Sequence, residues 1–218
     1  MQSTFMTNQQ EGLQAIQDIK RIMERSSRFI SLSGWSGVGA GLCAIAGAIV
    51  ADNRINSYNQ EVFTSDSPCQ VCLVRDLFII AGLVFISALL LAFLFTWLRS
   101  RKDGIPLWGN SARRLIWNTF LPFAVGGILV LRLQQLGYYE LVAPSCLIFY
   151  GLALINGSKF TVGEIKYLGY LILATGLVNL WAPRYGLYFW ALGFGIFHIF
   201  YGLIMWWKYE RTEGKAGI

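Results

Sequence analysis

Charged residues are scarce in this chain of 218 residues. They make up 14% of it, whereas hydrophobic residues make up 55%. A soluble domain usually carries about 25% charged residues, so this deficit excludes an ordinary soluble globular protein. The net charge of +6 follows from the topology of a membrane protein, and we expect no nucleic acid as a partner. The lipid bilayer is the expected environment.

Histidine and acidic residues are nearly absent from the apolar runs. His198 is the single histidine of the chain, which excludes a bis-histidine haem site within one chain. No Asp or Glu lies near the middle of any apolar run. Proton- and sodium-coupled transporters commonly place acids there, so the sequence argues against coupled transport. Uncoupled passage of a small neutral solute stays open.

Six apolar runs predict an all-α fold, a polytopic membrane bundle of about six transmembrane helices arranged as three hairpins. About twenty helical residues cover the hydrocarbon core of about 30 Å. The fifth run is short, and Thr161 with Glu164 resembles a capping box that would lengthen it. The first hairpin has an expected outer loop from Asp52 to Cys72. The runs are 29–51, 77–98, 115–137, 141–156, 165–181 and 186–207.

Lys and Arg residues gather on one side of the predicted spans. Most of the 18 such residues lie in the N-terminal segment, in the connections after the second and fourth runs, or in the tail at 208–218. Cytoplasmic loops of membrane proteins carry an excess of these residues. We therefore expect both termini in the cytoplasm, with the six-span domain at 29–207 between them.

The segment 1–28 reads as a cytoplasmic amphipathic helix. Apolar residues recur in it at helical spacing between charged ones. Two interpretations stay open: the helix lies on the membrane surface or against its own bundle, or it docks a membrane or cytoplasmic protein. The candidate partner-binding residues are Leu13, Ile16, Ile19 and Met23.

Glycines are frequent in the first and sixth runs, where small residues let helix backbones approach closely in lipid. They indicate packing within the bundle or, as the alternative, contacts in a homo-oligomer or with a partner. The residues are Gly34, Gly37, Gly39, Gly41, Gly47, Gly193, Gly195 and Gly202.

Two ionisable side chains within or near the spans are candidate binding residues. His198 lies near the middle of the sixth run; we expect a neutral imidazole bonded to a Ser, Thr or Asn of another helix, or else a proton relay or ligand contact. Arg132 lies near the outer end of the third run. It is either an interfacial anchor or part of a polar pocket at the outer face, where it would bind an anionic or carbonyl group. The polar residues that follow it are Gln134, Gln135, Tyr138, Tyr139 and Glu140.

Cys69 and Cys72 form a Cys-x-x-Cys pair on the expected outer side. Ser67 suits the N-cap of the second membrane helix, and Pro68 suits its first position. A helix N-terminus stabilises a thiolate and makes a cysteine more reactive, and Arg75 adds positive charge. The pair is either a structural disulfide that staples the outer loop or a redox-active catalytic pair.

The run Pro68-Cys69-Gln70-Val71-Cys72-Leu73-Val74-Arg75 resembles the DsbB-type quinone-linked disulfide oxidases. The resemblance implies that Cys69 and Cys72 are the redox pair, that Arg75 contacts the quinone, and that quinone is the cofactor. In that family the arginine stands one residue further from the second cysteine, there are four spans, and a second outer-loop cysteine pair is present. Here the other two cysteines lie in spans.

A second segment, Met23-Glu-Arg-Ser-Ser-Arg-Phe-Ile-Ser-Leu-Ser-Gly34, is similar to uncharacterised bacterial multi-pass inner-membrane proteins. This resemblance implies a bacterial inner membrane and no particular activity. The leading functional hypothesis is a non-enzymatic subunit, scaffold or sensor without a cofactor. The alternatives are a thiol-disulfide oxidoreductase using Cys69 and Cys72 with quinone, or a small-solute facilitator.

Overall fold

The computed structural model describes residues 33–64, 68–104 and 108–210, and within them it forms helices and short connections without a β-strand. The expected N-terminal helix at 1–28 lies outside the described residues. The predicted all-α membrane bundle is confirmed. Its helices are α2 (Gly34–Thr64), α3 (Gln70–Asp103), α4 (Asn110–Gln135), α5 (Val142–Gly157), α6 (Ile165–Trp181), α7 (Gly186–Trp190) and α8 (Phe197–Met205). Between α7 and α8 lies the π-helical stretch η4 (Ala191–Ile196), and η5 (Trp206–Glu210) follows α8.

In the part of the chain that the structure describes, five helical stretches are long and apolar enough to cross a membrane, and α6, with 17 residues, is a shorter apolar helix beside them. The expected lengthening of α6 by a capping box is wrong. Thr161 is fully buried in extended backbone at φ −137° and ψ −159°. Glu164 is instead the N-cap residue and makes no side-chain capping bond. At 1.5 Å per residue α6 is about 26 Å long, slightly less than the hydrocarbon core.

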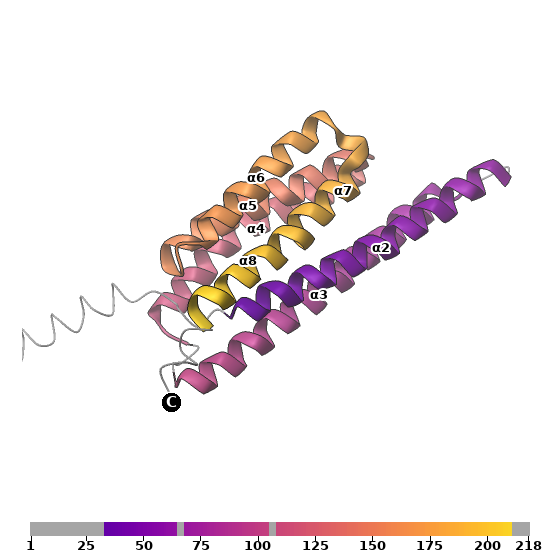
Figure 1. Cartoon of the computed structure of the whole chain (residues 1–218). Helices are drawn as coiled ribbons and strands as arrows, with labels where there is room; N and C mark the ends of the chain where they lie inside the picture. The colour runs from indigo at the N-terminus through magenta and orange to yellow at the C-terminus, as the bar shows by residue number, and fades with distance from the viewer. Residues whose placement is uncertain (1–32, 65–67, 105–107, 211–218) are drawn as a thin grey trace, which may run out of the picture.

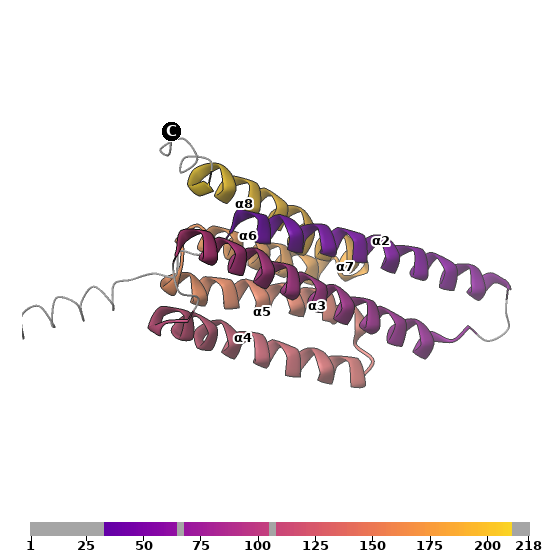
Figure 2. The same cartoon turned by 90° about the horizontal axis from the view of Figure 1, so that it is seen from below.

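The helices form two groups that the last span joins (Figures 1 and 2). Helices α2 and α3 pair as a long antiparallel hairpin, while α5 packs between α4 and α6. The last span, from α7 through α8, packs against both α2 and the α5–α6 pair. Helix α3 meets α4 where Phe85 stacks on Phe123, with ring centroids 5.4 Å apart. The α2–α3 hairpin is therefore held mainly through α2.

Backbone contact between glycines attaches this hairpin to the last span. A Cβ added to Gly202 would lie 2.5 Å from the Gly34 carbonyl oxygen, and one added to Gly41 would lie 2.6 Å from the Gly195 oxygen. Such distances leave no room for a side chain. Packing of these glycines within the chain's own bundle, predicted above, is confirmed.

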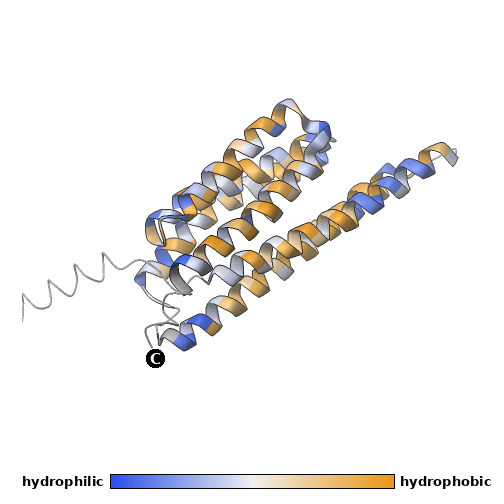
Figure 3. Cartoon of the chain, in the orientation of Figure 1, coloured by the Kyte–Doolittle hydropathy of each residue, from blue (hydrophilic) through white to orange (hydrophobic). Residues whose placement is uncertain are grey.

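The expected outer loop from Asp52 to Cys72 is wrong, because α2 continues as a helix to Thr64 and α3 begins at Gln70. No Gly or Pro stands between Gly47 and Pro68 to interrupt the helix. The hairpin consequently runs beyond the other helices (Figure 1). Figure 3 shows its middle as hydrophobic and the stretch toward its tip as largely hydrophilic.

Candidate functional site

The Cys69–Cys72 disulfide closes the first turn of α3 at the tip of the hairpin. Cys69 is the N-cap residue, and its Sγ accepts a hydrogen bond from the Cys72 backbone N–H at 3.3 Å. The helix thus begins later than expected: Pro68 precedes the cap, and Ser67 lies outside the described residues. The sulfur therefore takes the capping position that the sequence suggested for a serine.

A structural staple explains this disulfide poorly. It joins residues of a single helical turn, where the N–H groups of Cys72 and Leu73 already donate to the Cys69 carbonyl at 3.1 and 3.2 Å. It does not tie α2 to α3. Closing so short a loop removes little entropy from the unfolded chain. The disulfide therefore adds little to the stability of the fold, and its chemical reactivity is the property that can account for its presence.

The position of the two sulfurs favours exchange chemistry. Cys69 is exposed and Cys72 is half-buried, so a thiol from outside reaches Cys69 first. On reduction, a thiolate at the Cys69 cap would keep its N–H donor and would face the positive end of a 34-residue helix. Both interactions stabilise the anion. A thiolate at this place is a good leaving group and a good nucleophile.

Below the disulfide, a cluster of charges joins the two helices of the hairpin. Arg54 Nε donates to Asp76 Oδ2 at 2.9 Å, and Arg54 Nη1 lies 3.4 Å from Glu61 Oε1. Arg75 Nη2 lies 3.3 Å from Asp76 Oδ1, and the Arg75 side chain is 69% exposed. The sequence interpretation did not include Asp76. Its only sequence signal is an acid at the start of an apolar run, one residue after a basic one.

A pocket of about 570 Å³ opens between the N-terminal end of α3 and the C-terminal end of α4. Val71, which stands between the two cysteines in the sequence, is part of its wall. One side is apolar and the other carries amide and phenol groups, a combination that suits a flat amphiphile with carbonyl oxygens. The lining residues are Val71, Val74, Arg75, Phe78, Ile79, Gln134, Gln135 and Tyr139.

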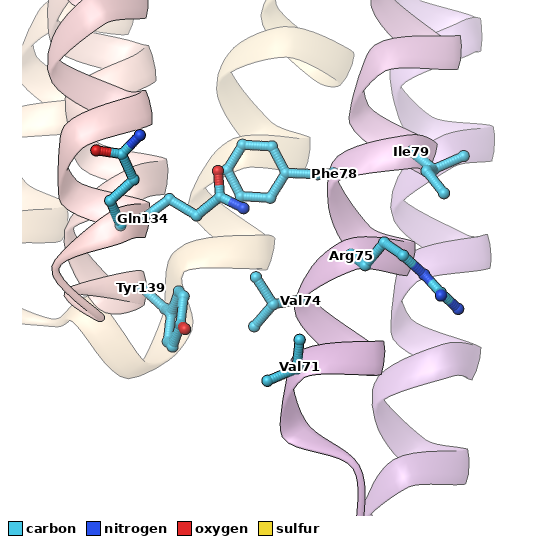
Figure 4. Close-up of a pocket in the computed structure, with 8 residues that line it drawn as sticks. Val71, Val74, Arg75, Phe78, Ile79, Gln134 and Tyr139 are labelled. Carbon is cyan, nitrogen blue, oxygen red and sulfur yellow. The ribbon is translucent and has the colours of Figure 1, made fainter.

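Figure 4 shows how these side chains lie. Val71, Val74 and Phe78 extend from α3 toward α4, where the Gln134 side chain lies, with Tyr139 below it. The Arg75 side chain extends away from Gln134 and Tyr139, toward its partner Asp76. In this conformation, the guanidinium does not face the polar side of the pocket.

The outer polar pocket expected around Arg132 is formed by its neighbours instead. Gln134, Gln135 and Tyr139 line the cavity, and Arg132 is absent from its lining. The Arg132 guanidinium Nη1 donates to Gln135 Oε1 at 3.2 Å. Arg132 therefore holds the lining residue Gln135 and does not itself reach the cavity. A ligand would meet the amides of Gln134 and Gln135 and the phenol of Tyr139 on the α4 side of the pocket.

His198 is buried in the bundle, and its partner is a residue that the sequence interpretation missed. Its Nε2 lies 2.9 Å from the Tyr150 hydroxyl of α5, and its Nδ1 lies 3.0 Å from the Gly193 carbonyl oxygen. A carbonyl only accepts, so Nδ1 carries a proton, and in a neutral ring the tyrosine donates to Nε2. The expectation of a Ser, Thr or Asn partner is wrong, and the neutral form of the ring stays a prediction. Gly193 belongs to the π-helical stretch η4.

The remaining predicted site residues, Leu13, Ile16, Ile19 and Met23, lie outside the described residues, so the docking of a partner by the N-terminal segment stays a prediction. A scan against protein-family models and searches of curated proteins and of solved structures found nothing that matches this chain. The features of the chain that bear on its function are therefore the disulfide, the charge cluster and the pocket.

Proposed function

We propose that the protein is a membrane thiol-disulfide exchange protein whose redox centre is the Cys69–Cys72 pair. The observation that carries this proposal is the position of the disulfide: it caps a membrane helix, exposes one sulfur and contributes little to holding the fold. We favour this function over a non-enzymatic subunit, the leading hypothesis from the sequence, because it accounts for the disulfide at the N-terminus of α3.

In the proposed reaction, a thiolate of a partner dithiol attacks the exposed Cys69 sulfur. The Cys69–Cys72 bond breaks, and Cys72 leaves as a thiolate that takes up a proton. The second partner thiol, after losing its proton, then attacks the mixed disulfide and releases Cys69. One partner disulfide forms, and two electrons and two protons move to the cysteine pair.

A quinone is the proposed oxidant that regenerates the disulfide. When bound, it would supply the oxidising equivalents: the Cys69 and Cys72 thiols would give up two electrons and two protons to it and re-form their disulfide, leaving a quinol. The pocket beside Val71 supports this choice, because Gln134, Gln135 and Tyr139 can donate hydrogen bonds to carbonyl oxygens while the α3 side is apolar. Direct contact by Arg75, as the DsbB-type resemblance implies, would require its release from Asp76.

The proposed location is a bacterial inner membrane with both termini in the cytoplasm and the cysteine pair outside. Lys and Arg residues gather at the C-terminal end of α3, the N-terminal end of α4 and around the α5–α6 connection, at the end of the bundle opposite the N-terminus of α3 (Figure 1). They are Arg99, Arg101, Lys102, Arg113, Arg114, Lys159 and Lys166. This separation of charge is the one that the positive-inside rule requires. In this orientation the disulfide would face an oxidising compartment.

The proposal is tested with the full chain in nanodiscs, given a reduced dithiol peptide and a short-chain quinone. We expect quinone reduction with one peptide disulfide formed per quinol. Cys69→Ser and Cys72→Ser should each abolish turnover. Cys43→Ser and Cys146→Ser are the matched controls, because both residues are free cysteines, and they should keep it. Turnover that survives Cys69→Ser would refute the proposal.

A scaffold or subunit role is the second candidate, favoured by the hairpin that extends past the other helices (Figure 2). Its partner would be a protein held by this hairpin or by the N-terminal segment. Replacing Ile16 and Ile19 with Asp should release a partner bound by that segment and leave membrane insertion intact. Unchanged co-purification would exclude docking there. Facilitated solute passage stays a prediction, to be tested by flux into liposomes.

A further inference from the structure

Among the described residues that line the pocket between α3 and α4, Arg75 is the charged one. Figure 4 shows its side chain extending away from Gln134 and Tyr139. The guanidinium lies instead beside Asp76, with Nη2 at 3.3 Å and Nε at 3.4 Å from Asp76 Oδ1. Asp76 is not part of the lining. A carboxylate outside the cavity therefore draws the charged group of its wall away from the opposite wall.

The carboxylate of Asp76 is itself held from α2. Arg54 Nε donates to Asp76 Oδ2 at 2.9 Å, so each oxygen of the carboxylate contacts a different arginine. The Asp76 side chain is 28% exposed, whereas that of Arg75 is 69% exposed. Asp76 is thus the fixed member of its pair with Arg75. The long, exposed Arg75 side chain is the member that could turn toward the pocket without unpacking a helix.

The α4 side of the pocket offers neutral hydrogen-bond donors. Arg132 Nη1 donates to Gln135 Oε1 at 3.2 Å, which leaves the amide N–H groups of Gln135 for a ligand. Gln134 and Tyr139 add an amide and a phenol. Such donors suit the carbonyl oxygens of a neutral ring. An ionised ring would lose water on entering the pocket while the Arg75 guanidinium faced away from it, which is unfavourable.

We propose that Asp76 is a positioning residue that holds the Arg75 guanidinium out of the pocket, so that the pocket selects neutral quinone rings against ionised ones. This inference rests on the proposed function and narrows the class of its cofactor. The DsbB-type resemblance implies contact between the arginine and the quinone, and the contacts of Asp76 oppose that contact here. The acid follows Arg75 directly in the sequence, so a single turn of α3 carries both groups.

The test measures binding to the full chain in nanodiscs, with the disulfide intact and no reductant, so that no exchange takes place. One probe is a dimethylnaphthoquinone, which is neutral. The other has a ring hydroxyl in place of one methyl group and is an anion at neutral pH. Equilibrium dialysis against empty nanodiscs corrects for partition into lipid. We expect the wild type to favour the neutral probe, and Asp76→Asn to raise the ratio of anion affinity to neutral affinity about twofold to fivefold, the range that an exposed ion pair controls.

Two variants separate this role from other effects of Asp76. Arg54→Gln removes the link to α2 and keeps the Arg75–Asp76 pair, so the ratio should not rise. Adding Arg75→Gln to Asp76→Asn should abolish the gain. An unchanged ratio in Asp76→Asn, an equal rise in Arg54→Gln, or a gain that survives without Arg75 would each overturn the inference and leave thiol exchange standing. A wild type that binds neither probe would overturn the proposed quinone site, and this inference with it.

Discussion

Arg54 of α2 and Asp76 of α3 form an ion pair at 2.9 Å that ties the two helices together below the disulfide. Beyond its packing along α2, helix α3 has few attachments to the bundle, and its contact with α4 includes the stack of Phe85 on Phe123. The ion pair therefore adds a polar link between α2 and α3 near the N-terminus of α3, where the disulfide lies.

We expect Asp76→Asn to loosen the outer part of the hairpin, because it removes the charge that Arg54 and Arg75 share. Amide hydrogen exchange over residues 52–64 should become faster in the variant. High salt screens the ion pair of the wild type, so it should reduce the difference in exchange rate between the wild type and the variant. Asp52→Asn is the control, since the Asp52 carboxylate accepts from Asn56 within its own helix. If the amide hydrogens of the two variants exchange at equal rates, the ion pair does not hold the hairpin together.

The Tyr150–His198 hydrogen bond should contribute to stability without serving proton transfer. Tyr150→Phe leaves the buried Nε2 acceptor unpaired, which we expect to cost about 0.5–2 kcal/mol. Adding His198→Leu should cost less than the sum of the two single changes. Unfolding in mixed micelles measures both. If the double variant is as stable as expected but exchange with a dithiol stops, the pair takes part in the reaction.

The glycine contact between α2 and α8 allows a sharp comparison. Gly202→Ala would place a methyl group 2.5 Å from the Gly34 carbonyl oxygen, so the helices must separate. We expect a loss of at least 1–3 kcal/mol, about the cost of overpacking. Gly127→Ala, on α4, meets nothing within 4 Å and should be neutral or stabilising by up to about 1 kcal/mol. Similar melting temperatures for the two variants would contradict the packing described.

The orientation is tested by reporter fusions. A reporter after Thr64 should read as external, and reporters after Lys102 and Lys215 as cytoplasmic. Thr64 is the last residue of α2, so a fusion there leaves that helix whole. An external signal at Lys102 would reverse the assignment of sides and put the disulfide in the reducing cytoplasm.

Long apolar runs predicted the membrane helices because the length of such a run can be counted directly from the sequence. The helical extension from Asp52 to Thr64 was missed because it is polar and was read as a loop. The absence of Gly and Pro between Gly47 and Pro68 was the available signal. In this stretch, helix propensity and the lack of a helix-breaking residue predict the structure better than hydropathy does.

The contacts of the site were harder to predict. The cysteine pair and the polar residues after Arg132 were predicted from their residue types. Of the latter, Gln134, Gln135 and Tyr139 line one pocket with Val71, whereas Tyr138 and Glu140 are not part of its lining. No local pattern joins Tyr150 to His198, which lie 48 positions apart. Such pairs depend on which helices pack together, and hydrophobic periodicity does not specify that.

The most direct test of the central claim is the redox equilibrium of the Cys69–Cys72 pair. The full chain with Cys43→Ser and Cys146→Ser, so that only this pair titrates, is equilibrated with glutathione buffers and alkylated with a mass tag. An exchange centre should titrate between about −120 and −270 mV, the range of disulfide oxidoreductases. A potential below about −300 mV, typical of structural disulfides, would contradict the account.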